Sequence, residues 1–209
     1  MNKAKKALLI LVTVATGFSQ THDNKDLHFG LFIGGNASGI YGQYMTHEIF
    51  KTGLNGGVTL IRKIADNLDF RSGVYLIGKG FKTRKIKSAD YKDRNERYYF
   101  LSNYLEVPFL IQFKGSVIEI ESIWMAGFGA AVNISNVGKT KVDDKSYSVD
   151  IQKNIRPYDI TLILGTNKMA GHHLNVDFRA SAGLIPYNTH ADFLGKRHLS
   201  LMASLGYIF

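Results

Sequence analysis

A two-residue alternation of apolar and polar side chains runs through the segment Tyr99 to Phe113, YFLSNYLEVPFLIQF. Its apolar side carries Leu101, Leu105, Val107, Phe109, Ile111 and Phe113, and Asn103 interrupts it. Side chains of a β-strand point alternately to two faces, so this period predicts a strand with one apolar and one polar face. An ordinary strand has about five or six residues. A strand this long suits the wall of a barrel that crosses a bilayer, where the apolar face contacts lipid.

Seven further segments show the same alternation, which gives eight predicted strands. The predicted strands are residues 27–36, 53–63, 68–80, 99–113, 124–134, 158–165, 174–183 and 199–209. The connections are long after the first, third, fifth and seventh strands and short after the second, fourth and sixth. Outer-membrane barrels have an even number of antiparallel strands, with long loops outside and short turns in the periplasm. The pattern therefore predicts an all-β fold, an eight-stranded antiparallel up-and-down transmembrane β-barrel.

The polar face of these strands combines glycine with charged residues of both signs. An eight-stranded barrel is narrow, so glycine on the inner face makes room for larger polar side chains. Unpaired charges away from water are costly, which implies that charges on this face form pairs. We predict an interior polar network of Asp69, Arg71, Glu106, Asp177 and Arg179, with Lys79 on the same face. A secreted soluble lipocalin-like barrel is the alternative, and it would place the apolar face inside.

The first residues read as a secretory signal peptide. Lys3, Lys5 and Lys6 precede a short apolar run from Ala7 to Thr16, and small residues stand at Gly17 and Ser19. The run is shorter than the roughly 20 apolar residues of a membrane-spanning helix. We therefore expect residues 1–19 to be a cleaved leader and residues 20–209 to form one barrel domain. Removing the three lysines of the leader lowers the formal charge from +9 to +6.

The segment Tyr104-Leu105-Glu106-Val107-Pro108, followed by an apolar run, resembles the "YLEIP" strand of the PorT family and of related small outer-membrane β-barrel domains. The resemblance implies a non-enzymatic integral outer-membrane protein and a link to a protein-secretion system of the outer membrane. Proline cannot donate a hydrogen bond to a strand ladder and a closed barrel has no edge. We therefore predict a β-bulge at Pro108.

Several partners follow from the same reading. The last strand ends on the aromatic residue Phe209, which resembles the signal recognised by the barrel assembly machinery. The basic segment from Lys82 to Arg97 is predicted to be a solvated loop that contacts the phosphates of lipopolysaccharide. Other secretion-system membrane proteins are expected partners. The sequence shows no nucleic-acid motif, and with no cysteine it excludes disulfides and thiolate metal sites. We expect no cofactor and no bound metal.

Two other functions are open at this stage. A lipid-modifying barrel enzyme would need a nucleophile and a base near one rim, and His198 with Ser200 or Ser181 is the candidate set. The sequence offers no acidic residue at a spacing that would complete a catalytic triad with them. A solute pore is disfavoured, because eight strands filled by large side chains leave no wide channel. The adjacent pair His172 and His173 points to opposite faces in a strand and predicts a turn rather than a metal site.

Overall fold

The fold of this chain is taken from a computed structural model. It describes residues 26–42, 48–83, 86–87, 95–117, 120–142, 145–149, 155–188 and 195–209. The predicted leader, residues 1–19, lies outside this range. Among the described residues, no helix is long and apolar enough to cross a bilayer.

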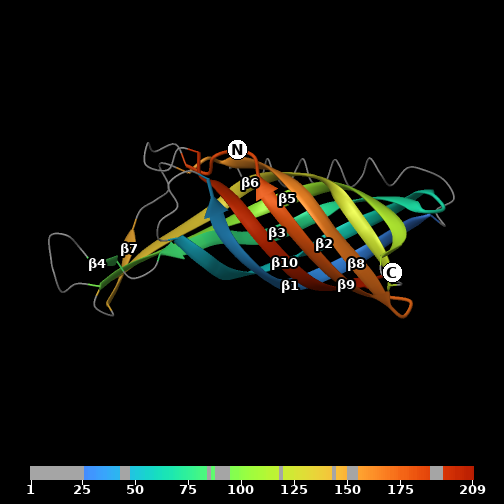
Figure 1. Ribbon diagram of the computed structural model, residues 1–209, viewed down its shortest axis with the longest axis horizontal. Helices are drawn as coiled ribbons and strands as arrows, with labels where there is room; N and C mark the ends of the chain where they lie inside the picture. The colour runs from blue at the N-terminus through green and yellow to red at the C-terminus, as the bar shows by residue number, and fades with distance from the viewer. Residues whose placement is uncertain are drawn as a thin grey trace.

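Ten strands lie within the described residues, and eight of them close into one antiparallel barrel (Figure 1). The barrel strands are β1 (Leu27–Tyr41), β2 (Glu48–Ala65), β3 (Leu68–Thr83), β5 (Asn95–Val117), β6 (Ile120–Val142), β8 (Tyr158–Ala170), β9 (Leu174–Gly183) and β10 (Arg197–Ile208). Each pairs with the next along the chain, and β1 pairs with β10 to close the wall. The predicted fold class is confirmed.

The strands extend further toward the long connections than the sequence predicts. β1 continues to Tyr41, β2 starts at Glu48 and β6 continues to Val142, inside segments predicted as loops. Two short strands, β4 (Ile86–Lys87) and β7 (Lys145–Val149), pair with the ends of β5 and β6. A four-stranded wall, β4-β5-β6-β7, thus projects beyond the barrel at this end (Figure 1). The described parts of 82–97 and 135–157 are therefore largely strand, and their prediction as loops is wrong there.

The long and short connections lie at opposite ends of the barrel, as predicted. The short turns after β2 and β8 lie at one end, together with the first and last described residues. There the amide of Lys63 donates to the carbonyl of Asp26 at 2.9 Å, and the amide of Phe209 donates to the carbonyl of Phe29 at 2.8 Å. We call this the short-turn end and the opposite one the long-loop end.

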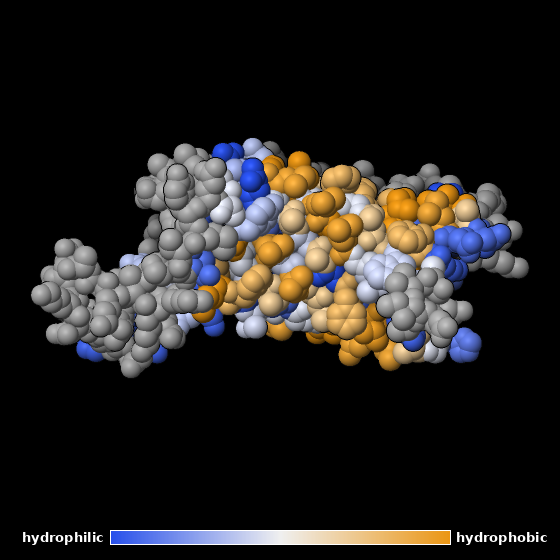
Figure 2. Space-filling view, in the orientation of Figure 1, coloured by the Kyte–Doolittle hydropathy of each residue, from blue (hydrophilic) through white to orange (hydrophobic). Residues whose placement is uncertain are grey.

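Exposed apolar side chains of all eight barrel strands form a belt around the outside of the barrel. Figure 2 shows one face of this belt, with hydrophilic residues toward both ends. Leu54 and Ile33 are 80% and 74% exposed, and every barrel strand carries large apolar residues in this outward position. Polar side chains outnumber apolar ones among the buried residues that the structure describes. A soluble protein has the opposite distribution. The lipocalin-like alternative, with an apolar interior, is therefore wrong.

The predicted bulge at Pro108 is also wrong. Glu106 pairs with Tyr75 and Phe109 pairs with Ser72, so the β3–β5 register is the same on both sides of the proline. The ladder omits the two intervening residue pairs instead, and the Ser72 hydroxyl donates to the Pro108 carbonyl at 2.8 Å. The register shift of β5 lies against β6, between Asn103 and Tyr104. Proline has no backbone N–H to donate, and the β3–β5 ladder accommodates this with a gap that the Ser72 side chain bridges, so no extra residue is needed.

Candidate functional site

The lumen of the barrel is the place where the chain gathers its buried charges. Alternate residues of every barrel strand point inward, and they form successive layers along the barrel axis. From the short-turn end these layers are an open mouth, a central cluster around Arg71, an upper cluster around Lys79 and an aromatic layer near the long loops.

The central cluster is an ion network of three charged side chains. Nη1 of Arg71 donates to Oδ2 of Asp177 at 2.7 Å, and Nε of Arg179 donates to Oδ1 of Asp177 at 2.8 Å. Both guanidinium groups also donate to the hydroxyl of Tyr75, at 3.2 and 3.0 Å. The residues come together because β3 and β9 each present one face inward, where residues two apart are neighbours. Arg71 is 0% exposed, so the lumen is filled at this level.

An aromatic ring packs on this network from β1. The guanidinium carbon of Arg71 lies 4.4 Å from the centroid of the Phe32 ring, a cation–π distance. Gly206 faces the same ring, and a Cβ added there would lie 2.2 Å from it. Phe32 breaks the alternation of the first strand in the sequence, yet it shares even numbering with the inward residues Gly30 and Gly34. The inward position of Phe32 was therefore predictable from its even spacing from these glycines, although not from its apolar character.

The upper cluster joins one lysine to two carboxylates. Nζ of Lys79 donates to Oε2 of Glu106 at 2.9 Å and lies 3.8 Å from Oδ2 of Asp159. The ring of Tyr104 lies 5.2 Å from the ammonium. All four side chains are buried. Breaking one partner of such a pair is strongly destabilising, because the remaining charge is left without compensation.

Apolar and aromatic side chains cover the upper cluster at the long-loop end. Phe81, Phe100 and Tyr187 contact one another with ring centroids 5.3 to 5.8 Å apart, and Ile40 is buried with them. Tyr187 lies in the connection between β9 and β10, and burial raises the pKa of its hydroxyl above the ordinary value.

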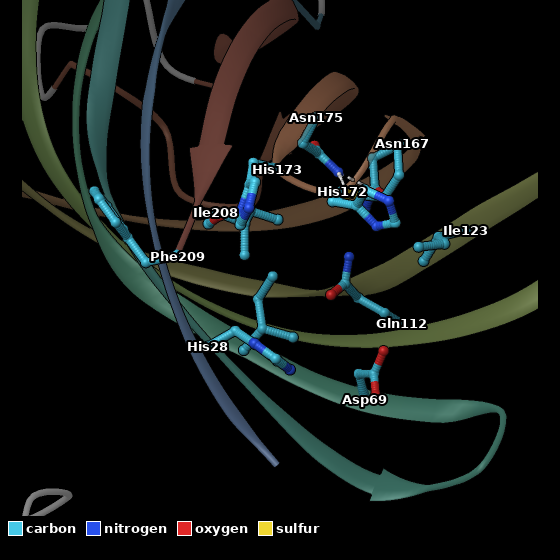
Figure 3. Close-up of a pocket in the computed structure, with 12 residues that line it drawn as sticks. His28, Asp69, Gln112, Ile123, Asn167, His172, His173, Asn175, Ile208 and Phe209 are labelled. Atoms are coloured by element: carbon cyan, nitrogen blue, oxygen red, sulfur yellow. Dashed lines mark hydrogen bonds between the residues drawn. The ribbon is translucent and has the colours of Figure 1, made fainter. Parts of the chain in front are cut away.

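The predicted network residues divide among three places. Arg71, Asp177 and Arg179 meet in the central cluster, whereas Glu106 pairs with Lys79 in the upper one. Asp69 belongs to neither and lines the mouth at the short-turn end (Figure 3). The sequence reasoning did not assign Asp159 or Tyr75 to the network, although both fall on the inward face. The pairing of carboxylates with cations depends on how neighbouring strands are aligned in the barrel. The alternation of apolar and polar residues shows which face a residue occupies but not this alignment.

The residues of the enzyme alternative also face the lumen. His198, Ser181 and Ser200 are all buried there, and Nε2 of His198 lies 3.3 Å from the Tyr104 hydroxyl. His172 and His173 lie at the turn between β8 and β9, where Nδ1 of His173 is 2.7 Å from the Ile208 carbonyl. Within the described ranges, no three histidine or acidic side chains are grouped so that they could hold a metal ion.

Phe209 follows the last strand at the short-turn end. Its ring is 64% exposed and contacts the ring of Tyr207 edge-on at a centroid distance of 5.1 Å. An exposed terminal aromatic is accessible to another protein, and its role as an assembly signal stays a prediction.

Comparison with known proteins gives a family match and matches to several solved outer-membrane proteins. The family model described as outer membrane protein beta-barrel domain matches residues 18–187. The crystal structure of Ail, the attachment invasion locus protein of Yersinia pestis, is 10% identical, covers 88% of this chain and 99% of its own, and has a TM-score of 0.44. Neisserial surface protein A is 8% identical, covers 86% of this chain and 96% of its own, and has a TM-score of 0.42. No curated protein sequence matches the chain.

The family match spans most of the chain, and the closed barrel with its outward apolar belt is the structure that such a domain requires. The match also locates the protein in the outer membrane, with the belt in contact with lipid. The chain belongs to the outer membrane protein β-barrel domain family.

Proposed function

We propose that this protein is a non-enzymatic scaffold in the outer membrane that presents its long-loop end to partners outside the barrel. The observation that carries the proposal is the projecting wall. β5 and β6 have 23 residues each, whereas β9 has 10 and is long enough to cross a bilayer. The additional length of β5 and β6 therefore extends beyond the membrane and forms a surface rather than a span.

The filled lumen supports the same proposal. Charged and aromatic side chains occupy successive layers between the two ends, so transport of solutes through the barrel is not what this interior favours. A barrel of this kind acts through the parts that lie outside the membrane. Following the resemblance of Tyr104 to Pro108, the partner we propose is a membrane protein of a PorT-like secretion system.

Crosslinking from the wall tests the proposal. A photoreactive amino acid at Tyr147 on β7, which is 53% exposed, is expected to capture a membrane protein of the secretion system in intact cells. The matched control is Tyr207, 47% exposed at the other end of the barrel, which should not capture that protein. Crosslinks from Tyr147 to lipid alone would contradict a scaffold role for the wall.

Lipopolysaccharide is the second proposed partner, at the outer face of the wall. Lys82, Tyr99 and Lys139 occupy one cross-strand row, so their side chains lie on the same face near the long-loop end. Ammonium groups there suit phosphate. Replacing both lysines by glutamate is expected to reduce copurifying lipopolysaccharide, whereas Lys63→Glu at the short-turn end should not. Equal lipopolysaccharide in both proteins would remove this partner.

The proposal that the protein is not an enzyme is tested by replacing His198, the candidate base of the lipid-modifying alternative. The side chain is buried inside the barrel rather than at its lipid face, so we expect His198→Ala to leave lipid A in the membrane unchanged. A change in the lipid A species, seen by mass spectrometry, would favour the lipid-modifying alternative.

A further inference from the structure

The short-turn end of the barrel contains a blind cavity of about 350 Å³ that the proposed function does not use (Figure 3). All eight barrel strands or their ends contribute to its lining. It is closed toward the membrane centre, because the inward residues further along the strands include Arg71, Asp177 and the buried apolar group Leu110, Met125 and Ile163. Its size lies at the lower end of the roughly 300–1,000 Å³ of small-molecule sites.

Two asparagines in the cavity wall leave polar atoms without partners. Nδ2 of Asn175 donates to Oδ1 of Asn167 at 3.1 Å (Figure 3). The remaining atoms of the pair, Nδ2 of Asn167 and Oδ1 of Asn175, have no hydrogen-bond partner, and the two side chains are 2% and 1% exposed. If both amides were turned over, the pair would still leave one N–H donor and one carbonyl acceptor free. Buried polar groups are normally satisfied, so a donor and an acceptor side by side indicate a missing partner.

A flexible side chain separates this pair from the open space. Nδ2 of Asn175 also contacts Sδ of Met169 at 3.2 Å, and Met169 lines the cavity. Thioether sulfur is a weak acceptor and methionine has three rotatable side-chain bonds. Rotation of the methionine side chain would therefore cost little and would open the free donor of Asn167 and the free acceptor of Asn175 to a ligand in the cavity.

The chemistry of the site matches a secondary amide with an aliphatic side chain. An amide offers one acceptor and one N–H, complementary to the free donor and acceptor of the pair. Ile61, Ile123, Met169 and Ile208 supply apolar wall, which suits a hydrocarbon side chain. The rim carries Asp69 together with His28, so it does not select an anion. We propose that this cavity binds a peptide segment on the periplasmic side, through its backbone amide and an aliphatic side chain.

Titration with N-acetyl-leucinamide, a neutral amide with an aliphatic side chain, tests the proposal. The full barrel is embedded in lipid nanodiscs, and side-chain amide signals of asparagine are followed by NMR. We expect saturable shifts of the Asn167 and Asn175 signals. No saturable shift would overturn the proposal. Equal shifts with N-acetylglucosamine, which has the amide without the aliphatic group, would overturn the assignment to a peptide.

Variants separate the site from nonspecific partition into lipid. Replacing Asn167 and Asn175 together by leucine is expected to weaken binding by about tenfold or more, because the paired donor and acceptor are lost. Ile61→Trp fills part of the cavity with a larger side chain and leaves the asparagines intact. This variant tests the site even if the double variant does not fold. Asn103→Leu, at a half-buried asparagine of β5 far from the cavity, is the matched control and should bind as the parent protein does. Unchanged affinity in Ile61→Trp would contradict binding in the cavity.

Discussion

Asp177 balances the charge of the central lumen, since it accepts hydrogen bonds from both Arg71 and Arg179. Replacing it by asparagine keeps the size of the side chain but leaves two buried guanidinium groups without a counterion. We expect Asp177→Asn to lower the free energy of unfolding by about 3–5 kcal/mol. Urea unfolding in lipid, followed by the gel mobility of the folded barrel, measures it.

The matched control for this prediction is Asp66→Asn at the β2–β3 turn. Asp66 pairs with Lys63 at 2.8 Å, but its side chain is 95% exposed. Exposed ion pairs are screened by water, so no measurable change is expected. A loss at Asp177 no larger than at Asp66 would contradict the role given to the buried network.

Two adjacent glycines of β1 provide a second test at single residues. A Cβ at Gly34 would lie 2.0 Å from the backbone oxygen of Ala203, whereas one at Gly35 would lie 3.7 Å from the oxygen of Gly53. Gly34→Ala therefore forces β1 away from β10 at the seam that closes the barrel. We expect it to cost about 1–3 kcal/mol or to prevent folding, and Gly35→Ala to be tolerated. Comparable thermal unfolding of the two variants would show that the seam relaxes more easily than this packing implies.

The inward residues could be predicted individually from the sequence, but their partners could not. Arg71 and Asp177 are 106 positions apart, and they meet because β3 and β9 lie across the lumen at the same depth. Asp69 has the same parity as Arg71, yet its place two residues nearer the short turn puts it in the mouth. Depth in a barrel depends on strand tilt and register, which two-residue alternation does not encode.

At the scale of elements, strand centres were predictable and strand ends were not. β9 has the bounds that were predicted for it, because apolar lipid-facing residues mark its whole length. β5 and β6 instead continue into polar sequence such as Asn95 to Arg97. In the projecting wall, backbone pairing with β4 and β7 continues where the alternation of apolar and polar residues has ended.

The gap in the β3–β5 ladder leads to a prediction about Ser72. Its hydroxyl donates to the Pro108 carbonyl at 2.8 Å where two residue pairs of the ladder are missing. Ser72→Ala leaves this buried carbonyl without that donor, and we expect a loss of about 1–3 kcal/mol in the free energy of unfolding. Ser135→Ala, which removes an exposed hydroxyl bonded to Asn103, is the control and should stay within about 0.5 kcal/mol of the parent. Equal effects would mean that the gap is bridged in another way.

At the scale of the whole molecule, the protein is an outer-membrane barrel with apolar side chains outside and polar side chains inside, the reverse of a soluble domain. The apolar belt is satisfied by lipid, so the lumen is free to hold charges that a soluble core of this size would exclude. Charge pairing then fills the space that wider barrels leave as a channel. The same arrangement separates the two ends, for which we propose different partners.

This separation predicts that the barrel does not conduct. The layers around Arg71, Lys79 and Phe81 lie in series between the mouth and the long loops, so a solute would have to break two buried ion networks to pass. We expect vesicles containing the protein to retain a small sugar at the rate of protein-free vesicles, while a general porin in matched vesicles releases it. The release must be measured on protein shown to be folded by its heat-dependent gel mobility, because an unfolded chain would also fail to conduct. Rapid release by the folded barrel would mean that the charged layers move aside together, and the lumen rather than the projecting wall would then be the functional part of the molecule.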